Sequence, residues 1–216
     1  MAKIDTISAS HIMTCYMDYV ASHKNKPISV DDFSQICQFE TEAFYEHFLS
    51  FNALEKHIYN HFFENALAIL NTSQEYQQFS KKEKLLSLYF TFFETLTLNK
   101  EFVRADLKGF ENQLKALSVF STLKSSFTTY IDDLELELFT VNVEAIHSIQ
   151  QKTIKESAWI QLLFTLKFWL EDTSKDFEKT DVFIEKSITT SMELINSNSL
   201  HHIMDLAKFI YQETVN

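Results

Sequence analysis

Apolar residues recur at intervals of three and four along most of this chain, which is the spacing of one face of an α-helix. In the N-terminal third this spacing predicts helices over 6–24, 30–37, 41–48 and 51–71. The two short helices are separated only by a compact turn at 38–40. Short helices joined by such a turn and followed by a longer helix form the layout of a helix-turn-helix, here over 28–54.

The pattern continues to the C-terminus as helical segments separated by polar connections. It predicts helices over 85–98, 99–109, 111–128, 130–151, 156–171, 181–196 and 199–213. Residues 71–79 and 172–180 are polar and are expected to be connections. The domain boundary is expected inside or just after the helix that ends near residue 70, which gives domains of 1–70 and 71–216.

The composition narrows the fold class to an all-α protein. The chain of 216 residues contains one Gly and one Pro, too few for the turns of a mainly β or α/β fold and for a Gly-rich phosphate loop. A chain of this length can bury a substantial core. We find no signal peptide and no apolar run of transmembrane length, so we expect a cytoplasmic protein with reduced thiols.

Candidate chemistry is sparse. The two cysteines, Cys15 and Cys37, lack metal-ligand spacing, and His57 and His61 lie four residues apart without a cysteine to complete a site. No nucleophile has a recognisable base partner in the sequence. We therefore expect no enzyme activity, no metal and no cofactor.

The helix-turn-helix segment resembles the TetR family of transcriptional regulators. Tyr45, His47 and Phe48 match the family's Tyr-x-His-Phe core, and Leu54 matches its closing leucine. Gln38 stands where the family has the turn glycine. The resemblance implies a ligand-responsive regulator that binds DNA through the second short helix. The residues expected to contact DNA are Thr41, Tyr45, His47, Lys24 and Lys26.

The charge of this segment opposes DNA binding. The whole chain carries a net charge of −11, and residues 28–60 contribute −5, from six carboxylates against the single Lys56. DNA affinity depends mainly on neutralising phosphates, so carboxylates on the reading helix weaken it. Two further hypotheses therefore stay open: a TetR-like protein that binds a lipid or an isoprenoid or quinone-type ligand without binding DNA, and a partner-binding module that uses the acidic segment.

The C-terminal part carries a second resemblance, over 168–188. The string from Glu171 to Ser174 and the following Asp176-Phe177-Glu178 look like the end of TetR-type C-terminal domains, and also like the TetR-like lipid-binding proteins of coenzyme Q biosynthesis. The resemblance implies a homodimer formed through the two flanking helices. The expected interface residues are Trp159, Leu163, Leu166, Trp169, Phe183, Ile184, Ile188 and Met192.

Aromatic residues concentrate in the central helices, where TetR-like proteins enclose their ligand. The chain contains 21 Phe, and aromatic side chains either fill a core or line a cavity for an apolar ligand. Both alternatives remain open. The residues expected to line such a pocket are Tyr89, Phe92, Phe93, Phe102, Phe110, Phe120, Phe127 and Tyr130.

Overall fold

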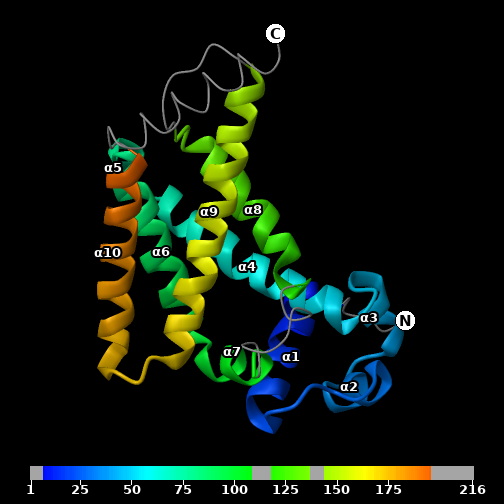
Figure 1. Cartoon of the computed structure of the whole chain (residues 1–216). Coiled ribbons are helices and arrows are strands. Elements are labelled where there is room, and N and C mark those ends of the chain that lie inside the picture. Colours follow the sequence, from blue (N-terminus) through cyan, green and yellow to red (C-terminus); the bar gives the residue numbers. More distant parts are fainter. Residues whose placement is uncertain (1–6, 109–117, 137–143, 196–216) are drawn as a thin grey trace. The chain divides into compact units, whose positions relative to one another are not determined.

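The computed structural model describes residues 7–108, 118–136 and 144–195, and all regular structure within these ranges is helical (Figure 1). The helices are α1 Ala9–His23, α2 Val30–Ile36, α3 Thr41–His47, α4 Phe51–Asn71, α5 Gln74–Gln78, α6 Lys81–Leu98, α7 Lys100–Asp106, α8 Ser121–Asp133, α9 Glu144–Glu171, the 3-10 turn η3 Lys175–Phe177 and α10 Glu178–Ile195. The all-α fold expected from the composition is confirmed. No described helix has the length and apolarity that crossing a membrane requires.

Contacts divide the chain into two compact units. The first comprises Met1–Ala66 and Phe92–Lys124, and the second comprises Leu67–Thr91 and Ser125–Asn216. We call the part of the first unit from α1 to residue 66 the head. The head shares its unit with α7, so the first unit includes more than the N-terminal segment. The boundary near residue 70 stays a prediction.

Aromatic rings that meet edge to face hold the first unit together. Phe33 of α2 is fully buried, and its ring meets that of Tyr16 on α1 at 5.8 Å and that of Phe44 on α3 at 6.2 Å, both edge to face. Such pairs stabilise a core beyond the area they bury. α1 also packs along α7. The short helices α2 and α3 are therefore fixed by the rings that they bury and not by their own length.

The second unit contains an antiparallel pair of helices, α9 and α10 (Figure 1). Trp169 on α9 and Ile184 and Ile188 on α10 are fully buried. One carboxylate, that of Asp172, organises the connection. Its oxygens accept hydrogen bonds from the backbone N–H of Ser174 at 2.8 Å and of Thr180 at 2.9 Å, and also from both hydroxyls.

Several predicted boundaries differ from the observed ones. The short helix α5 lies in the segment expected to be a connection, anchored by the buried Tyr76. α8 runs to Asp133, and Glu135 then adopts a left-handed φ of 50°, which ends the helical path. The segments predicted as helices 130–151 and 156–171 are instead the end of α8 and the single helix α9. The helix predicted over 199–213 lies outside the described residues.

Candidate functional site

The helix-turn-helix is built by local capping and by one strained turn residue. Ser29 accepts a hydrogen bond from the backbone N–H of Asp32 at 3.1 Å and so caps α2. Gln38 in the turn adopts a φ of 60°, the left-handed region that glycine enters most easily. Phe39 next to it is buried, and the Phe39 N–H donates to the Ser34 carbonyl at 3.0 Å. Tertiary packing therefore holds the turn without its glycine.

The outer face of α3 presents one large aromatic ring among carboxylates. Tyr45 is 52% exposed, and Glu42 and Glu46 beside it are also exposed. Thr41 is half-buried and donates its hydroxyl proton to Asp31 at 3.0 Å. The ring of His47 is exposed, but its Nε2 lies 2.7 Å from the Ile7 carbonyl oxygen. Thr41 and His47, two of the three predicted reading residues, thus already have partners within the first unit.

Both lysines expected to contact phosphate are paired with carboxylates. Lys24 Nζ lies 2.6 Å from Glu101 on α7, and both side chains are exposed. Lys26 Nζ lies 2.6 Å from Glu55 Oε1 on α4 and 3.0 Å from Asp106 Oδ1 on α7. Each ammonium charge is therefore compensated before a phosphate approaches. Lys56, the single lysine of 28–60, makes no ion pair with any residue that the structure describes.

Lys26 is the centre of a polar cluster in the first unit. The side chains of Glu55 and Asp106 are almost fully buried, and the phenols of Tyr16 and Tyr59 donate to them at 2.5 Å and 2.8 Å. Burial raises the pKa of Glu55, and the nearby charge of Asp106 adds to that effect.

The two acids also act on the basic member of this cluster. Burial alone would lower the pKa of Lys26, but the charge of Asp106 and the hydrogen bond to Glu55 raise it above its ordinary value. The ammonium group is consequently held charged between α4 and α7. A lysine held in this way supports the fold of the first unit and is a poor donor to a phosphate outside it.

The aromatic residues predicted to line a pocket are divided between the two units. Phe92, Phe93, Phe102 and Phe120 belong to the first unit and Tyr89, Phe127 and Tyr130 to the second, whereas Phe110 lies outside the described residues. Of the seven predicted pocket residues that the structure describes, all except Tyr130 are buried. In the first unit, Phe102 and Phe120 pack on Tyr59, with ring centroids 6.1 and 4.9 Å away. In the second, Phe127 packs between Tyr89 and Trp159, with ring centroids 6.2 Å from each.

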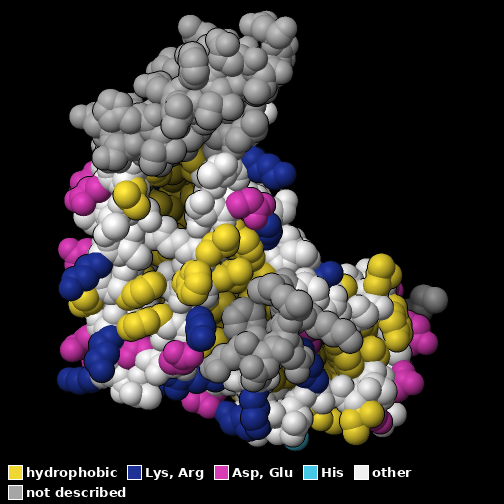
Figure 2. Space-filling view, viewed as in Figure 1, with side chains coloured by type: hydrophobic (Ala, Val, Ile, Leu, Met, Phe, Trp, Pro, Cys, Tyr) yellow, Lys and Arg dark blue, Asp and Glu magenta, His cyan; other side chains and the backbone are white. Residues whose placement is uncertain are grey.

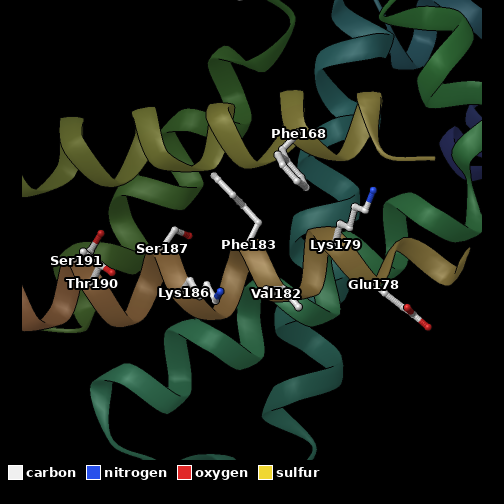
Figure 3. A pocket seen from close by; sticks show the side chains of 9 residues that line it. All are labelled: Phe168, Glu178, Lys179, Val182, Phe183, Lys186, Ser187, Thr190 and Ser191. Carbon is white, nitrogen blue, oxygen red and sulfur yellow. The ribbon is translucent and has the colours of Figure 1, made fainter. Parts of the chain in front are cut away.

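A groove runs along the outer face of α9 and α10. It has a volume of about 790 Å³, and its lining is mainly apolar. Phe168 and Phe183 stack across the two helices, with ring centroids 4.7 Å apart and planes 9° apart. Figure 3 shows the two rings between the helices and the amines of Lys179 and Lys186 on α10. Figure 2 shows apolar side chains over this part of the molecule, interspersed with basic ones.

Most residues predicted for the dimer interface are buried by the chain itself. Trp159, Leu166, Trp169, Ile184, Ile188 and Met192 are at most 9% exposed, while Leu163 and Phe183 are half-buried. A second set of apolar residues is exposed on the same helices. It consists of Ile160, Phe164, Val182 and Leu194, of which Phe164 is the most exposed at 62%. A partner that approaches α9 and α10 would first meet this second set.

Residues 84–210, more than half of the chain, match the family model of the tetracyclin repressor-like C-terminal domain. The chain belongs to the TetR family. The matched segment includes the groove and all the aromatic residues that were predicted to line a pocket, and it follows the helix-turn-helix along the chain. No curated protein matches this TetR-family chain. The resemblance to the lipid-binding proteins of coenzyme Q biosynthesis stays a prediction.

Sequence reasoning missed the ion pairs of this TetR-family protein that join residues far apart along the chain. Lys26 and Asp106 are 80 positions apart, and Lys24 and Glu101 are 77 apart, so no local pattern signals them. Sequence reasoning also missed which side of α9 is exposed. The segment is apolar nearly all round, so the spacing of its apolar residues does not distinguish buried from exposed positions. Among the described residues, no group of three or more His, Cys, Asp and Glu side chains is placed to hold a metal ion.

Proposed function

We propose that this chain is a homodimeric, ligand-responsive transcriptional regulator of the TetR type. The observation that carries the proposal is the co-occurrence in one chain of a TetR C-terminal domain and a folded helix-turn-helix whose α3 exposes Tyr45. The ligand is an apolar small molecule. Its differential affinity for two arrangements of the protein would change the affinity of the head for DNA.

The dimer is proposed to form through the exposed apolar residues of α9 and α10. Ile160 and Phe164 lie four residues apart on α9, next to the groove that contains Phe168 and Phe183. Two copies of such a helix pair form a four-helix arrangement that removes these side chains from water. Sedimentation velocity tests this: Phe164→Glu should convert dimer to monomer. Ile28→Glu, at an apolar residue of the head that is 94% exposed, is the matched control and should leave the dimer intact.

DNA binding by this regulator is expected to be weak and strongly dependent on salt. Glu42 and Glu46 on α3 repel phosphates, and Lys24 and Lys26 are paired with acids. Fluorescence anisotropy with random duplex DNA at low salt measures the affinity directly. The Glu42→Gln, Glu46→Gln double variant removes two carboxylates and should tighten binding by about tenfold, on the order of 1 kcal/mol in total.

The second candidate function is ligand binding without DNA binding, and the ion pairs of Lys24 and Lys26 favour it. In this case the ligand is a lipid or an isoprenoid or quinone-type molecule. Native mass spectrometry of the purified protein tests for such a ligand. If neither the native protein nor the double variant binds duplex DNA at micromolar concentration and low salt, the regulator proposal fails and the second candidate replaces it.

A further inference from the structure

Large apolar side chains are exposed on the head. They are Ile28, Ile36, Tyr45 and Leu49, of which Leu49 is 86% exposed. Tyr45 lies on the same face of α3 as the exposed Glu42 and Glu46, and Leu49 follows two residues after the end of this helix. Large apolar side chains that stay exposed close together mark a surface for a partner.

The start of α2 continues this surface. The Thr41 hydroxyl at the start of α3 donates to the Asp31 carboxylate on α2 at 3.0 Å, and Ile28 lies three residues before Asp31. Figure 2 shows apolar side chains over α2 and α3 with acidic ones beside them. The α2–α3 surface is defined by six exposed side chains, those of Ile28, Asp31, Glu42, Tyr45, Glu46 and Leu49.

The negative charge around these apolar residues is uncompensated. Residues 28–49 contain no lysine or arginine and five carboxylates, those of Asp31, Asp32, Glu40, Glu42 and Glu46. Within the described ranges, none of the five forms an ion pair with a lysine or arginine. Lys24 and Lys26, by contrast, are already paired with acids. The surface therefore attracts cationic side chains as strongly as it repels phosphates.

We propose that the α2–α3 surface is a docking site for a basic amphipathic helix of another protein. The apolar face of that helix covers Tyr45 and Leu49, and its lysines or arginines meet Glu42 and Glu46. Burial of the apolar side chains provides affinity, with Tyr45 as the aromatic anchor. The surrounding charges speed association and select a basic partner over an acidic one.

The same charges argue against other occupants of this surface. A second copy of the chain would bring two sets of carboxylates together, and duplex DNA would bring phosphates. The ends of this chain do not supply a basic segment either, because 1–6 contains one lysine and one aspartate, and 196–216 contains one lysine and two acids. The proposal goes beyond the regulator function, since docking needs no DNA. A docked partner would cover α3 and exclude DNA from it.

The test measures fluorescence anisotropy of a labelled amphipathic peptide of leucine and lysine with the full-length protein. Two control peptides have the same length: one carries glutamate in place of every lysine, and the other carries serine in place of every leucine. The leucine–lysine peptide should bind at micromolar concentration in low salt, and more weakly as salt is added. Both control peptides should bind at least about tenfold more weakly.

Apolar variants locate the bound peptide. Tyr45→Ser combined with Leu49→Ser should weaken binding of the leucine–lysine peptide by about tenfold, because the anchor of the surface is lost. Leu98→Ser, at a residue of α6 that is 77% exposed, is the matched control. It should change the affinity by less than about twofold. Circular dichroism should be unchanged in both variants, since all three side chains are exposed.

Charge variants separate docking from DNA binding. Glu42→Gln combined with Glu46→Gln should weaken binding of the peptide by about fivefold at low salt, whereas the same variant should tighten binding of duplex DNA. Glu185→Gln combined with Glu193→Gln removes the same charge from exposed positions of α10 and should leave the affinity for the peptide almost unchanged.

Three outcomes would overturn the proposal. The first is that the native protein does not bind the leucine–lysine peptide, or binds the serine control peptide equally well. The second is that both pairs of charge substitutions weaken binding equally, because the attraction then comes from the net charge of −11 of the whole chain. The third is that the Tyr45→Ser, Leu49→Ser variant converts dimer to monomer in sedimentation velocity, because a second copy then occupies this surface.

Discussion

Lys26 Nζ lies 3.0 Å from Asp106 Oδ1, which ties the connection before the helix-turn-helix to α7, 80 positions further along the chain. The same ammonium group contacts Glu55 on α4 at 2.6 Å. One lysine therefore compensates two buried carboxylates. Removing its charge leaves both acids without a cation, which is costly in a buried site.

Lys26→Met should lower the free energy of unfolding by about 2–3 kcal/mol at pH 7.5, less than for a fully buried pair because Lys26 is half-exposed. Burial raises the pKa of Glu55, so the folded protein binds a proton at this carboxyl more tightly than the unfolded chain does. Protonation of Glu55 therefore stabilises the folded protein increasingly as the pH falls. The loss should thus be smaller at pH 5. Urea denaturation at both pH values measures it.

Lys24→Met is the matched control for that experiment. It removes a lysine from the same connection, but its partner Glu101 is exposed. Exposed ion pairs contribute little, so Lys24→Met should leave the free energy of unfolding almost unchanged. Equal losses for the two variants would contradict the central role of Lys26.

Alkaline titration should reveal the buried phenols. Burial raises the pKa of Tyr16, Tyr59, Tyr89 and Tyr130 above the ordinary value for tyrosine. A raised pKa of this kind contributes stability that is complete below about pH 10 and is lost as the pH rises further. In a spectrophotometric titration, only part of the eight tyrosines should ionise before the helices melt. Ionisation of all eight near pH 10, with helical circular dichroism retained, would contradict this.

Asp172→Asn should loosen the connection between α9 and α10. Burial alone would raise the pKa of Asp172, but hydrogen bonds from Ser174 and Thr180 lower it to about 2. Its contribution is therefore present above about pH 4 and lost as the pH falls toward 2. We expect a loss of about 2 kcal/mol at pH 7, measured by thermal denaturation. Glu185→Gln, the same chemical change at an exposed position of α10, should have almost no effect.

Gln38→Gly should stabilise the protein. A left-handed φ costs a residue other than glycine about 1 kcal/mol, and part of this gain is offset by the greater freedom of glycine in the unfolded chain. The expected net gain is about 0.5 kcal/mol in urea denaturation. Gln38→Ala removes the same side chain without changing the backbone preference and should give no gain. A glycine variant less stable than the alanine variant would show that the Gln38 side chain supports the turn.

The sequence predicted the helix bounds that depend on neighbouring residues well, and it predicted contacts between residues far apart in the chain poorly. The bounds of α2, α3 and α4 follow from apolar spacing and from Ser29, because capping and periodicity act within one helical turn. The break at Glu135 was missed, since a carboxylate in left-handed backbone leaves no mark in the apolar pattern.

The placement of α9 could not be predicted for a related reason. Trp169 and Phe164 are both large and apolar in the sequence, yet one is fully buried and the other mostly exposed. Which side of an apolar helix faces inward is decided by its neighbours, and these are fixed only in the folded protein. The partners of Lys24 and Lys26 were hidden for the same reason.

The cluster around Lys26 has an evolutionary consequence. The ammonium group shared by two buried carboxylates cannot be exchanged alone, because its loss leaves both acids without a cation. In related chains, loss of the lysine at 26 should therefore be accompanied by loss of the acids at 55 and 106, whereas one acid can be replaced while the other still pairs with the lysine. Descendants that recover strong DNA binding should acquire new basic residues on α3 and keep Lys26 where it is.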